Sequence, residues 1–173
     1  MEATALSDCT LQACLVCLLV ILLFFTFANV VRDRLAAFIT SHLSKNLHKS
    51  KSIVQVKKKL FDCIEPGSTI VEVGAGSGAN FQFYPEGCTV ICVEPKVEFE
   101  GYILDSLKKR GEHLKSMRLV KGQGENLSSV VDAATVDYVV STLVMCSVED
   151  IQKSCSEVHK ILKPVGVGLH SSL

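Results

Sequence analysis

The segment at residues 69–80, T-I-V-E-V-G-A-G-S-G-A-N, constrains the fold more than any other part of the chain. Its first residues, I-V-E-V, are mostly β-branched, which is typical of a buried strand. Three glycines then follow at alternate positions, Gly74, Gly76 and Gly78. A strand, a glycine loop and a following helix together indicate the nucleotide-binding turn of a doubly wound α/β domain. Glycine lets the backbone approach a ligand closely, and the helix is expected to point free N–H groups at it.

The glycine spacing alone leaves two ligands open. Gly74, Gly76 and Ala79 also fit G-x-G-x-x-A, the dinucleotide fingerprint that a nicotinamide-dependent reductase would carry. Glu72 favours the other ligand, because a dinucleotide-binding strand is usually apolar two residues before the first glycine. A carboxylate there suits a ligand with a positive charge, such as the methionyl ammonium of S-adenosylmethionine. We therefore favour S-adenosyl-L-methionine as the cofactor.

Later segments continue the alternation of strands and helices. Strands are predicted over 89–93, 117–120 and 136–141, helices over 97–110 and 149–162, and a fifth strand over 165–170. Glu94 follows the second strand, 20 residues after Gly74, at the spacing where a carboxylate binds ribose hydroxyls. Thr142 follows the fourth strand, where open α/β sheets bind substrates, and is expected to face the sulfonium.

The composition excludes some functions. Lys+Arg and Asp+Glu both number 18, which argues against a general nucleic-acid binder. Trp is absent and 6% of residues are aromatic, so no base-stacking platform is indicated. The eight cysteines are scattered and are interpreted as reduced thiols in a reducing compartment. Cys14-x-x-Cys17 has metal spacing without a second pair of ligands, so no metal site is predicted.

An apolar run from Leu11 to Val31 predicts a membrane anchor. A helix of that length spans about 31 Å, which matches a bilayer core. The start of the chain carries Glu2 and Asp8 and no basic residue, so an uncleaved anchor is favoured over a signal peptide. Basic residues follow the run from Arg32 onward, which places the C-terminal side in the cytosol.

Residues 35–63 carry apolar residues at three- and four-residue spacing, which predicts an amphipathic helix. It would lie on a membrane surface or cover the α/β domain, and the pattern does not separate the two. The expected organisation is therefore a membrane anchor over 1–34, a helical linker or cover over 35–66, and a cofactor-binding domain over 67–173.

Several segments together carry a family resemblance. They are E-V-G-A-G-S-G-A-N-F-Q-F-Y-P-E-G-C, V-E-P, G-E-N-L, V-D-Y-V-V-S-T-L-V-M-C-S-V and E-V-H-K-I-L-K-P-V-G. With the N-terminal apolar run, they resemble the membrane-anchored methyltransferase-like proteins of the endoplasmic reticulum and lipid droplets, some of which are thiol S-methyltransferases. The resemblance implies a class I, Rossmann-like α/β sheet with strand order 3-2-1-4-5.

The resemblance also implies the cofactor contacts. The methionyl part of S-adenosyl-L-methionine would be held by Glu72, Gly74, Ala75, Gly76 and Gly78. Glu94 would hold the ribose, Gly124 and Glu125 would border the adenine, and Thr142 would complete the site. The implied activity is methylation of a small thiol or another lipophilic acceptor at a membrane, with no identifiable catalytic acid or base.

The chain departs from the family pattern near its end. Where the family has K/R-P-G-G and about another quarter of the domain, this sequence has Lys163-Pro164-Val165-Gly166 and a short tail. The expectation is therefore a shortened chain that lacks the last strands and exposes a sheet edge to a possible protein partner. A non-catalytic, membrane-anchored nucleotide-binding module is the alternative, and a nicotinamide-dependent reductase is a third.

Overall fold

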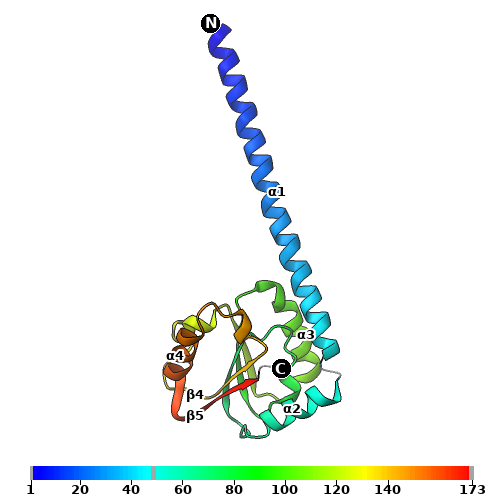
Figure 1. Ribbon diagram of the computed structural model, residues 1–173, viewed down its shortest axis with the longest axis vertical. Helices are drawn as coiled ribbons and strands as arrows, with labels where there is room; N and C mark the ends of the chain where they lie inside the picture. The colour runs from blue at the N-terminus through cyan, green and yellow to red at the C-terminus, as the bar shows by residue number, and fades with distance from the viewer. Residues whose placement is uncertain (1, 48–49, 172–173) are drawn as a thin grey trace. The chain divides into compact units, whose positions relative to one another are not determined.

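The computed structural model describes the backbone of residues 2–47 and 50–171, and side chains at residues 15, 18–43 and 50–169. The chain divides into two compact units, Met1–Thr40 and Ser41–Leu173. Helix α1, Glu2–Leu47, makes up the first unit and continues into the second (Figure 1).

The first unit does not support the predicted transmembrane helix. In the part of the chain that the structure describes, no helix is both long and apolar enough to cross a membrane. Part of the predicted run, residues 11–14 and 16–17, lies outside the described side chains.

The second unit is built on a parallel sheet with the order β3-β2-β1-β4-β5, which confirms the predicted order. The strands are β1 Thr69–Val73, β2 Thr89–Val93, β3 Ser116–Val120, β4 Val136–Thr142 and β5 Leu162–Ser171. β1 lies between β2 and β4, with Val73 opposite both Val93 and Ser141. The carboxyl ends of these three strands therefore meet at one edge of the sheet, directly before the glycine loop, Glu94 and the segment after Thr142.

The helices differ from the prediction in two places. The helix expected after the glycine loop is only a 3₁₀ turn, Phe81–Phe83. Tyr84 is already extended, with ψ 142°, because the residue before a proline is disfavoured in the helical region. The helix expected over 35–63 is divided between α1, which ends at Leu47, and α2, Lys51–Phe61. Helices α3, Glu100–Arg110, and α4, Ile151–Ile161, agree with the predicted pattern.

The main apolar core joins the sheet to α4 and to the 3₁₀ segment Gly124–Ser129. Its buried members include Val71, Val73, Leu127, Val139 and Ile161. Side chains from one face of the central strands thus pack against α4, as expected where helices cover a parallel sheet.

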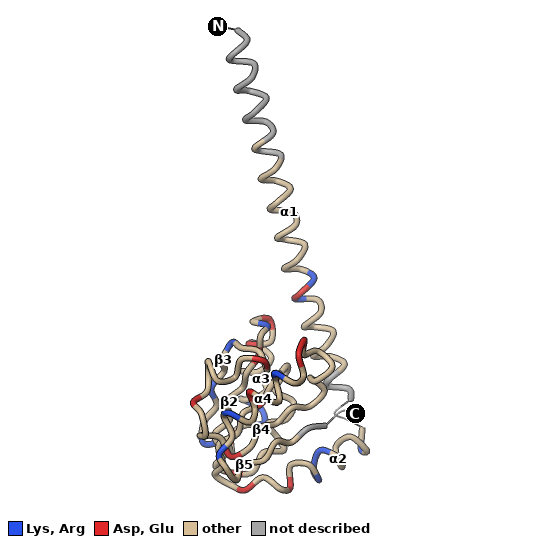
Figure 2. Tube along the Cα trace, turned by 60° about the vertical axis from the view of Figure 1, so that its left-hand side comes forward, with Lys and Arg blue, Asp and Glu red and all other residues tan. Residues whose placement is uncertain are grey.

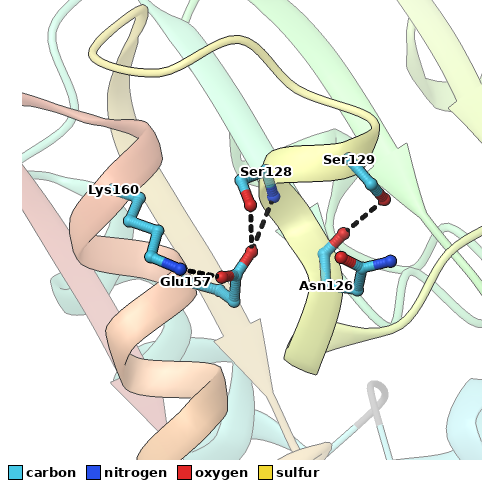
Figure 3. A network of polar contacts seen from close by, with 5 residues as sticks. All are labelled: Asn126, Ser128, Ser129, Glu157 and Lys160. Atoms are coloured by element: carbon cyan, nitrogen blue, oxygen red, sulfur yellow. Dashed lines mark hydrogen bonds and ion pairs between the residues drawn. The ribbon is translucent and has the colours of Figure 1, made fainter.

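A buried carboxylate strengthens this packing (Figure 3). Glu157 of α4 accepts hydrogen bonds from the backbone N–H and hydroxyl of Ser128, at 2.8 and 2.6 Å, and its other oxygen lies 2.6 Å from Lys160 Nζ. The Lys160 hydrogen bond, followed by those from Ser128, lowers the pKa of Glu157 to about 2. The ionised carboxylate therefore fixes the segment after Gly124 to α4.

Candidate cofactor site

The glycine loop has the geometry that its sequence predicts. The φ angles of Gly74, Gly76 and Gly78 are +66°, +53° and +66°, a region that L side chains rarely adopt. At Gly74 an added Cβ would lie 2.5 Å from Val144 Cγ2, so the space beside the loop is closed to any side chain. At Gly76 the nearest atom to such a Cβ would be Gly74 O, at 3.9 Å, so the loop is open there.

Glu94 lies where the sequence predicts a ribose ligand, at the carboxyl end of β2. Its Oε2 accepts a hydrogen bond from the backbone N–H of Gly76 at 2.9 Å, and Oε1 accepts one from Lys96 at 3.2 Å. Burial raises the pKa of Glu94, and these two backbone hydrogen bonds act against that rise. A carboxylate has about four acceptor positions, so the two oxygens keep capacity for two hydroxyl donors.

Glu72 is almost fully buried, with 1% of its surface exposed, and both of its oxygens are hydrogen-bonded. Asn80 Nδ2 donates to Oε1 at 2.7 Å, and the Tyr84 hydroxyl donates to Oε2 at 2.8 Å. Asn80 Nδ2 also donates to Thr142 Oγ1 at 2.9 Å. One amide therefore joins Glu72 and Thr142, two residues that the sequence analysis assigned to the site separately.

A buried lysine completes this network from outside the sheet. Lys57 of α2 is 1% exposed, and its Nζ donates to Asn80 Oδ1 at 2.6 Å. Burial lowers the pKa of Lys57 to about 8, although the negative charge of Glu72 acts to raise it. Burial likewise raises the pKa of Glu72 to about 7, although Tyr84, Asn80 and Lys57 all favour its ionised form.

Sequence reasoning missed Lys57, Asn80 and Tyr84 as members of the site. Lys57 stands among three consecutive lysines, and its neighbours Lys58 and Lys59 are exposed. The sequence pointed only to Asn80 and Tyr84 as candidates, because both lie inside a motif that carries the family resemblance. Nothing in the sequence singles out Lys57 from the lysines beside it.

The two residues predicted to border the adenine, Gly124 and Glu125, have different surroundings in the structure. Gly124 is buried beside the carboxyl end of β1, where an added Cβ would lie 3.3 Å from Val73 Cγ1 and 2.8 Å from Ser154 Oγ. Glu125 is directed to the segment before α4, since its Oε1 accepts from the backbone N–H of Glu149 at 2.7 Å. The position of Gly124 suits the edge of a crevice, whereas the carboxylate of Glu125 is engaged elsewhere.

The segment after β4 carries a cysteine thiol, which is a candidate nucleophile. Cys146 is exposed, and its Sγ lies 3.7 Å from the carbonyl oxygen of Leu143. The contacts of the described residues add no nucleophile–base pair here. The arrangement is one that binds and orients, and acid–base chemistry by the protein is not indicated.

The residues present fit S-adenosyl-L-methionine. A buried carboxylate at the end of β1 suits a cationic amino-acid group, and a carboxylate at the end of β2 suits two hydroxyls. The loop is open at Gly76, whose backbone N–H donates to Glu94. The first carboxylate suits the charged end of the ligand, and the second suits its uncharged ribose.

Comparison with solved structures gives the same fold. A proposed S-adenosyl-L-methionine-dependent methyltransferase from Methanococcus maripaludis matches with a TM-score of 0.68 at 16% identity, over 80% of this chain and 63% of its own. An S-adenosyl-L-methionine-dependent methyltransferase from Aquifex aeolicus matches with a TM-score of 0.55 at 18% identity, over 72% of this chain and 68% of its own. The fold is thus that of the Rossmann-like methyltransferases.

Sequence comparison gives the family. Residues 71–169 match the family model described as "Methyltransferase domain". Thiol S-methyltransferase TMT1B of Rattus norvegicus is 44% identical over 99 residues, 57% of this chain and 40% of the relative. The Mus musculus TMT1B is 38% identical over 123 residues, 68% of this chain and 50% of the relative, and human TMT1A is 44% identical over 98 residues, 57% and 39%.

The chain belongs to the methyltransferase-domain family, and the family implies S-adenosyl-L-methionine as cofactor. The predicted resemblance is therefore confirmed. The chain spans about half or less of the length of these curated relatives, from 39% to 50%.

Proposed function

We propose that this chain binds S-adenosyl-L-methionine and transfers its methyl group to a small thiol or another lipophilic acceptor. One observation carries the proposal: Asn80 joins Glu72 to Thr142, beside the glycine loop that Glu94 also contacts. The proposal is supported by the two carboxylates and the hydroxyl that these contacts bring to one loop. The names of the relatives support a thiol as the acceptor.

The residues of the chain would act by positioning. When bound, S-adenosyl-L-methionine supplies an electrophilic methyl group. Glu72 would hold the ammonium, Glu94 the ribose hydroxyls, and Thr142 the sulfonium side of the site. The acceptor thiol would give up its proton to water, and the bound cofactor would supply the methyl group that the sulfur takes as the sulfonium S–CH₃ bond is given up. Because a thiolate is already a strong nucleophile near neutral pH, orientation supplies most of the rate gain.

Calorimetry on the purified full chain, titrated with S-adenosylhomocysteine and with NADH, tests the cofactor. We expect binding of the homocysteine compound, and Glu72→Gln should weaken it because the ammonium loses its counter-charge. NADH binding without any response to S-adenosylhomocysteine would favour the reductase hypothesis and refute the proposal. Glu100→Gln, an exposed carboxylate on α3, is the matched control.

Turnover is tested separately with radiolabelled S-adenosyl-L-methionine and small alkyl thiols. The same assay should include a chain extended by the C-terminal half of a curated relative. Because this chain spans only part of those relatives, the non-catalytic module is the second candidate. Cofactor binding without label transfer, restored by the extension, would favour that module. Equal transfer by both chains would place the acceptor site within residues 1–173.

Location at a membrane is a further proposal, with the endoplasmic reticulum or lipid droplets as the expected membranes and the catalytic unit facing the cytosol. Its support is the run of exposed, mainly apolar side chains of α1 from Leu18 to Val31. The tan colour of this stretch in Figure 2 marks the absence of charged residues there. Carbonate extraction of microsomes is the test, and release of the chain into the supernatant would contradict membrane lipid as a partner. Protease protection of a C-terminal tag would contradict the cytosolic orientation.

A protein partner at the edge of β5 also stays a proposal. β5 is the last strand in the described sheet, and Val165 on it is 90% exposed. An unpaired edge invites pairing with another strand. Size-exclusion chromatography with light scattering would test this, and a monomer at all concentrations would count against pairing between copies.

A further inference from the structure

Helix α2 contributes a buried cation to a site that otherwise belongs to the sheet. Lys57 has 1% of its surface exposed, and its ammonium group lies 2.6 Å from Asn80 Oδ1. The same group lies 5.9 Å from the centre of the Phe83 ring, within the range of a cation–π contact. A buried lysine is costly, so a role beyond filling space is expected.

The hydrogen-bond chemistry of Lys57 determines how Asn80 is oriented. An ammonium group only donates hydrogen bonds, whereas an amide side chain has an accepting oxygen and a donating nitrogen. Lys57 therefore requires the oxygen of Asn80 on its side. The nitrogen then faces the opposite way, and its two hydrogens reach Glu72 Oε1 and Thr142 Oγ1.

Aromatic packing holds α2 against the same segment. The ring of Phe61 lies 5.1 Å from that of Tyr84 and 5.7 Å from that of Phe83. Tyr84 in turn donates to the second oxygen of Glu72. Thus α2 contacts, through Lys57 and Phe61, both residues that donate to Glu72.

From these contacts we infer that Lys57 is a positioning residue of the cofactor site. It fixes the amide of Asn80 so that its nitrogen faces Glu72 and Thr142, and its charge favours the anionic form of Glu72. Helix α2 therefore contributes to cofactor binding through Lys57. The inference rests on the proposed pairing of Glu72 with the methionyl ammonium.

The groups that face Glu72 set the direction of the expected pH effect. Burial opposes the ionised form of Glu72 most strongly, and Glu94 at the end of β2 also opposes it. The Tyr84 hydroxyl, the Asn80 amide and Lys57 on α2 favour the ionised form. Cys92 of β2 also interacts electrostatically with Glu72. Removing the charge of Lys57 deletes one favourable influence, so the pKa of Glu72 must rise.

The test compares two ligands with the purified full chain. S-adenosylhomocysteine carries the amino-acid part, and 5′-methylthioadenosine lacks it. Lys57→Met should weaken the binding of S-adenosylhomocysteine roughly tenfold, the loss expected for a disturbed hydrogen bond to a charged group. The affinity for methylthioadenosine should change by less than about twofold. Lys58→Met, an exposed lysine on the same helix, should change neither.

Two further measurements separate positioning from general damage. The double variant Lys57→Met/Asn80→Ala should lose less affinity than the sum of the two single losses, because Lys57 acts in part through Asn80. In the ligand-free protein, carbon NMR of the Glu72 carboxyl should give a higher midpoint in Lys57→Met than in the wild type. If Lys57→Met does not fold, Lys57→Gln keeps a donor for Asn80 without the charge. It should still raise that midpoint, and it should retain affinity at a pH above the raised midpoint, where Glu72 is ionised.

The outcomes are distinct. Unchanged or tighter S-adenosylhomocysteine binding by folded Lys57→Met, with an unchanged Glu72 midpoint, would overturn the inference. Equal weakening of both ligands would also overturn it, because that result indicates a structural role. If Glu72→Gln itself leaves S-adenosylhomocysteine binding intact, the proposed role of Glu72 fails first. If Glu72→Gln loses affinity for S-adenosylhomocysteine and Lys57→Met does not, the role of Lys57 is refuted and the proposed role of Glu72 stands.

Discussion

Replacing Glu72 with Gln should stabilise the ligand-free chain while weakening its binding of S-adenosylhomocysteine. Glu72 is 1% exposed, and burial raises its pKa from 4.5 to about 7. The folded chain therefore holds this proton more tightly than the unfolded chain, so stability falls as the pH rises from about 4.5 to about 7. Gln removes the ionisation and with it this loss.

The size of the effect follows from the pKa. Each pKa unit corresponds to about 1.4 kcal/mol, so ionised Glu72 costs about 3 kcal/mol of stability above pH 7. Two terms reduce the gain in the variant. Gln can accept from only one of Asn80 and Tyr84, which costs about 1 kcal/mol, and Lys57 loses its counter-charge. We expect a net stabilisation on the order of 1–2 kcal/mol at about pH 8 and none at about pH 4.

Denaturant unfolding of wild type and Glu72→Gln at both pH values measures this difference directly. Glu100→Gln should show no comparable pH-dependent gain, since Glu100 is exposed. Calorimetry on the same preparations gives the affinity for S-adenosylhomocysteine. A variant that is less stable than wild type at about pH 8, or whose stability difference does not change with pH, would refute the argument that Glu72 carries a buried charge.

Three further changes test other parts of the site. Glu94→Gln should weaken S-adenosylhomocysteine and methylthioadenosine together, by roughly 10- to 100-fold in calorimetry, because both carry the ribose; a loss for only one ligand would contradict ribose binding. Gly74→Ala should destabilise the chain by about 1–3 kcal/mol in thermal unfolding, since its Cβ would meet Val144 at 2.5 Å, whereas Gly101→Ala on α3 meets nothing within 4 Å and should be neutral or stabilising. Glu157→Gln should lower the free energy of unfolding by roughly 1.5–3 kcal/mol at neutral pH. Because folding lowers the pKa of Glu157 from 4.5 to about 2, this difference should shrink as the pH falls from 4.5 through 2 in acid titrations. A difference that does not depend on pH would exclude the ion pair as its cause.

The sequence by itself determined the fold of the second unit and the position of its ligand edge. The strands follow from short β-branched runs separated by helical patterns, because parallel strands buried on both faces read as continuous apolar segments. Their order was implied by the family resemblance, and the structure confirms it. The three alternate glycines were predictable for a similar reason, since positive φ is a local property that residue type restricts. Glu94 was predictable from its place at the end of a strand.

Other features of the chain differ from the local patterns or add to them. The sequence predicts a helix after the glycine loop that Pro85 breaks early, and the structure has only a 3₁₀ turn there, Phe81–Phe83. The predicted transmembrane helix over 11–31 is not supported, because no helix in the described residues meets the requirement for crossing a membrane. Glu125 carries the expected residue type, yet its carboxylate bonds to the backbone of Glu149, which lies far away in the sequence.

Only the tertiary structure brought Lys57 to Asn80, 23 residues away in sequence, and Asn80 to Thr142, 62 residues away. A lysine that is buried and one that is solvated carry the same sequence signal, since both occupy polar positions of an amphipathic helix. What distinguishes Lys57 from Lys58 is the docking of α2 through Phe61 against Phe83 and Tyr84. That docking depends on side-chain packing between distant segments, and it decides both which cation is buried and the ionisation of the carboxylate beside the glycine loop.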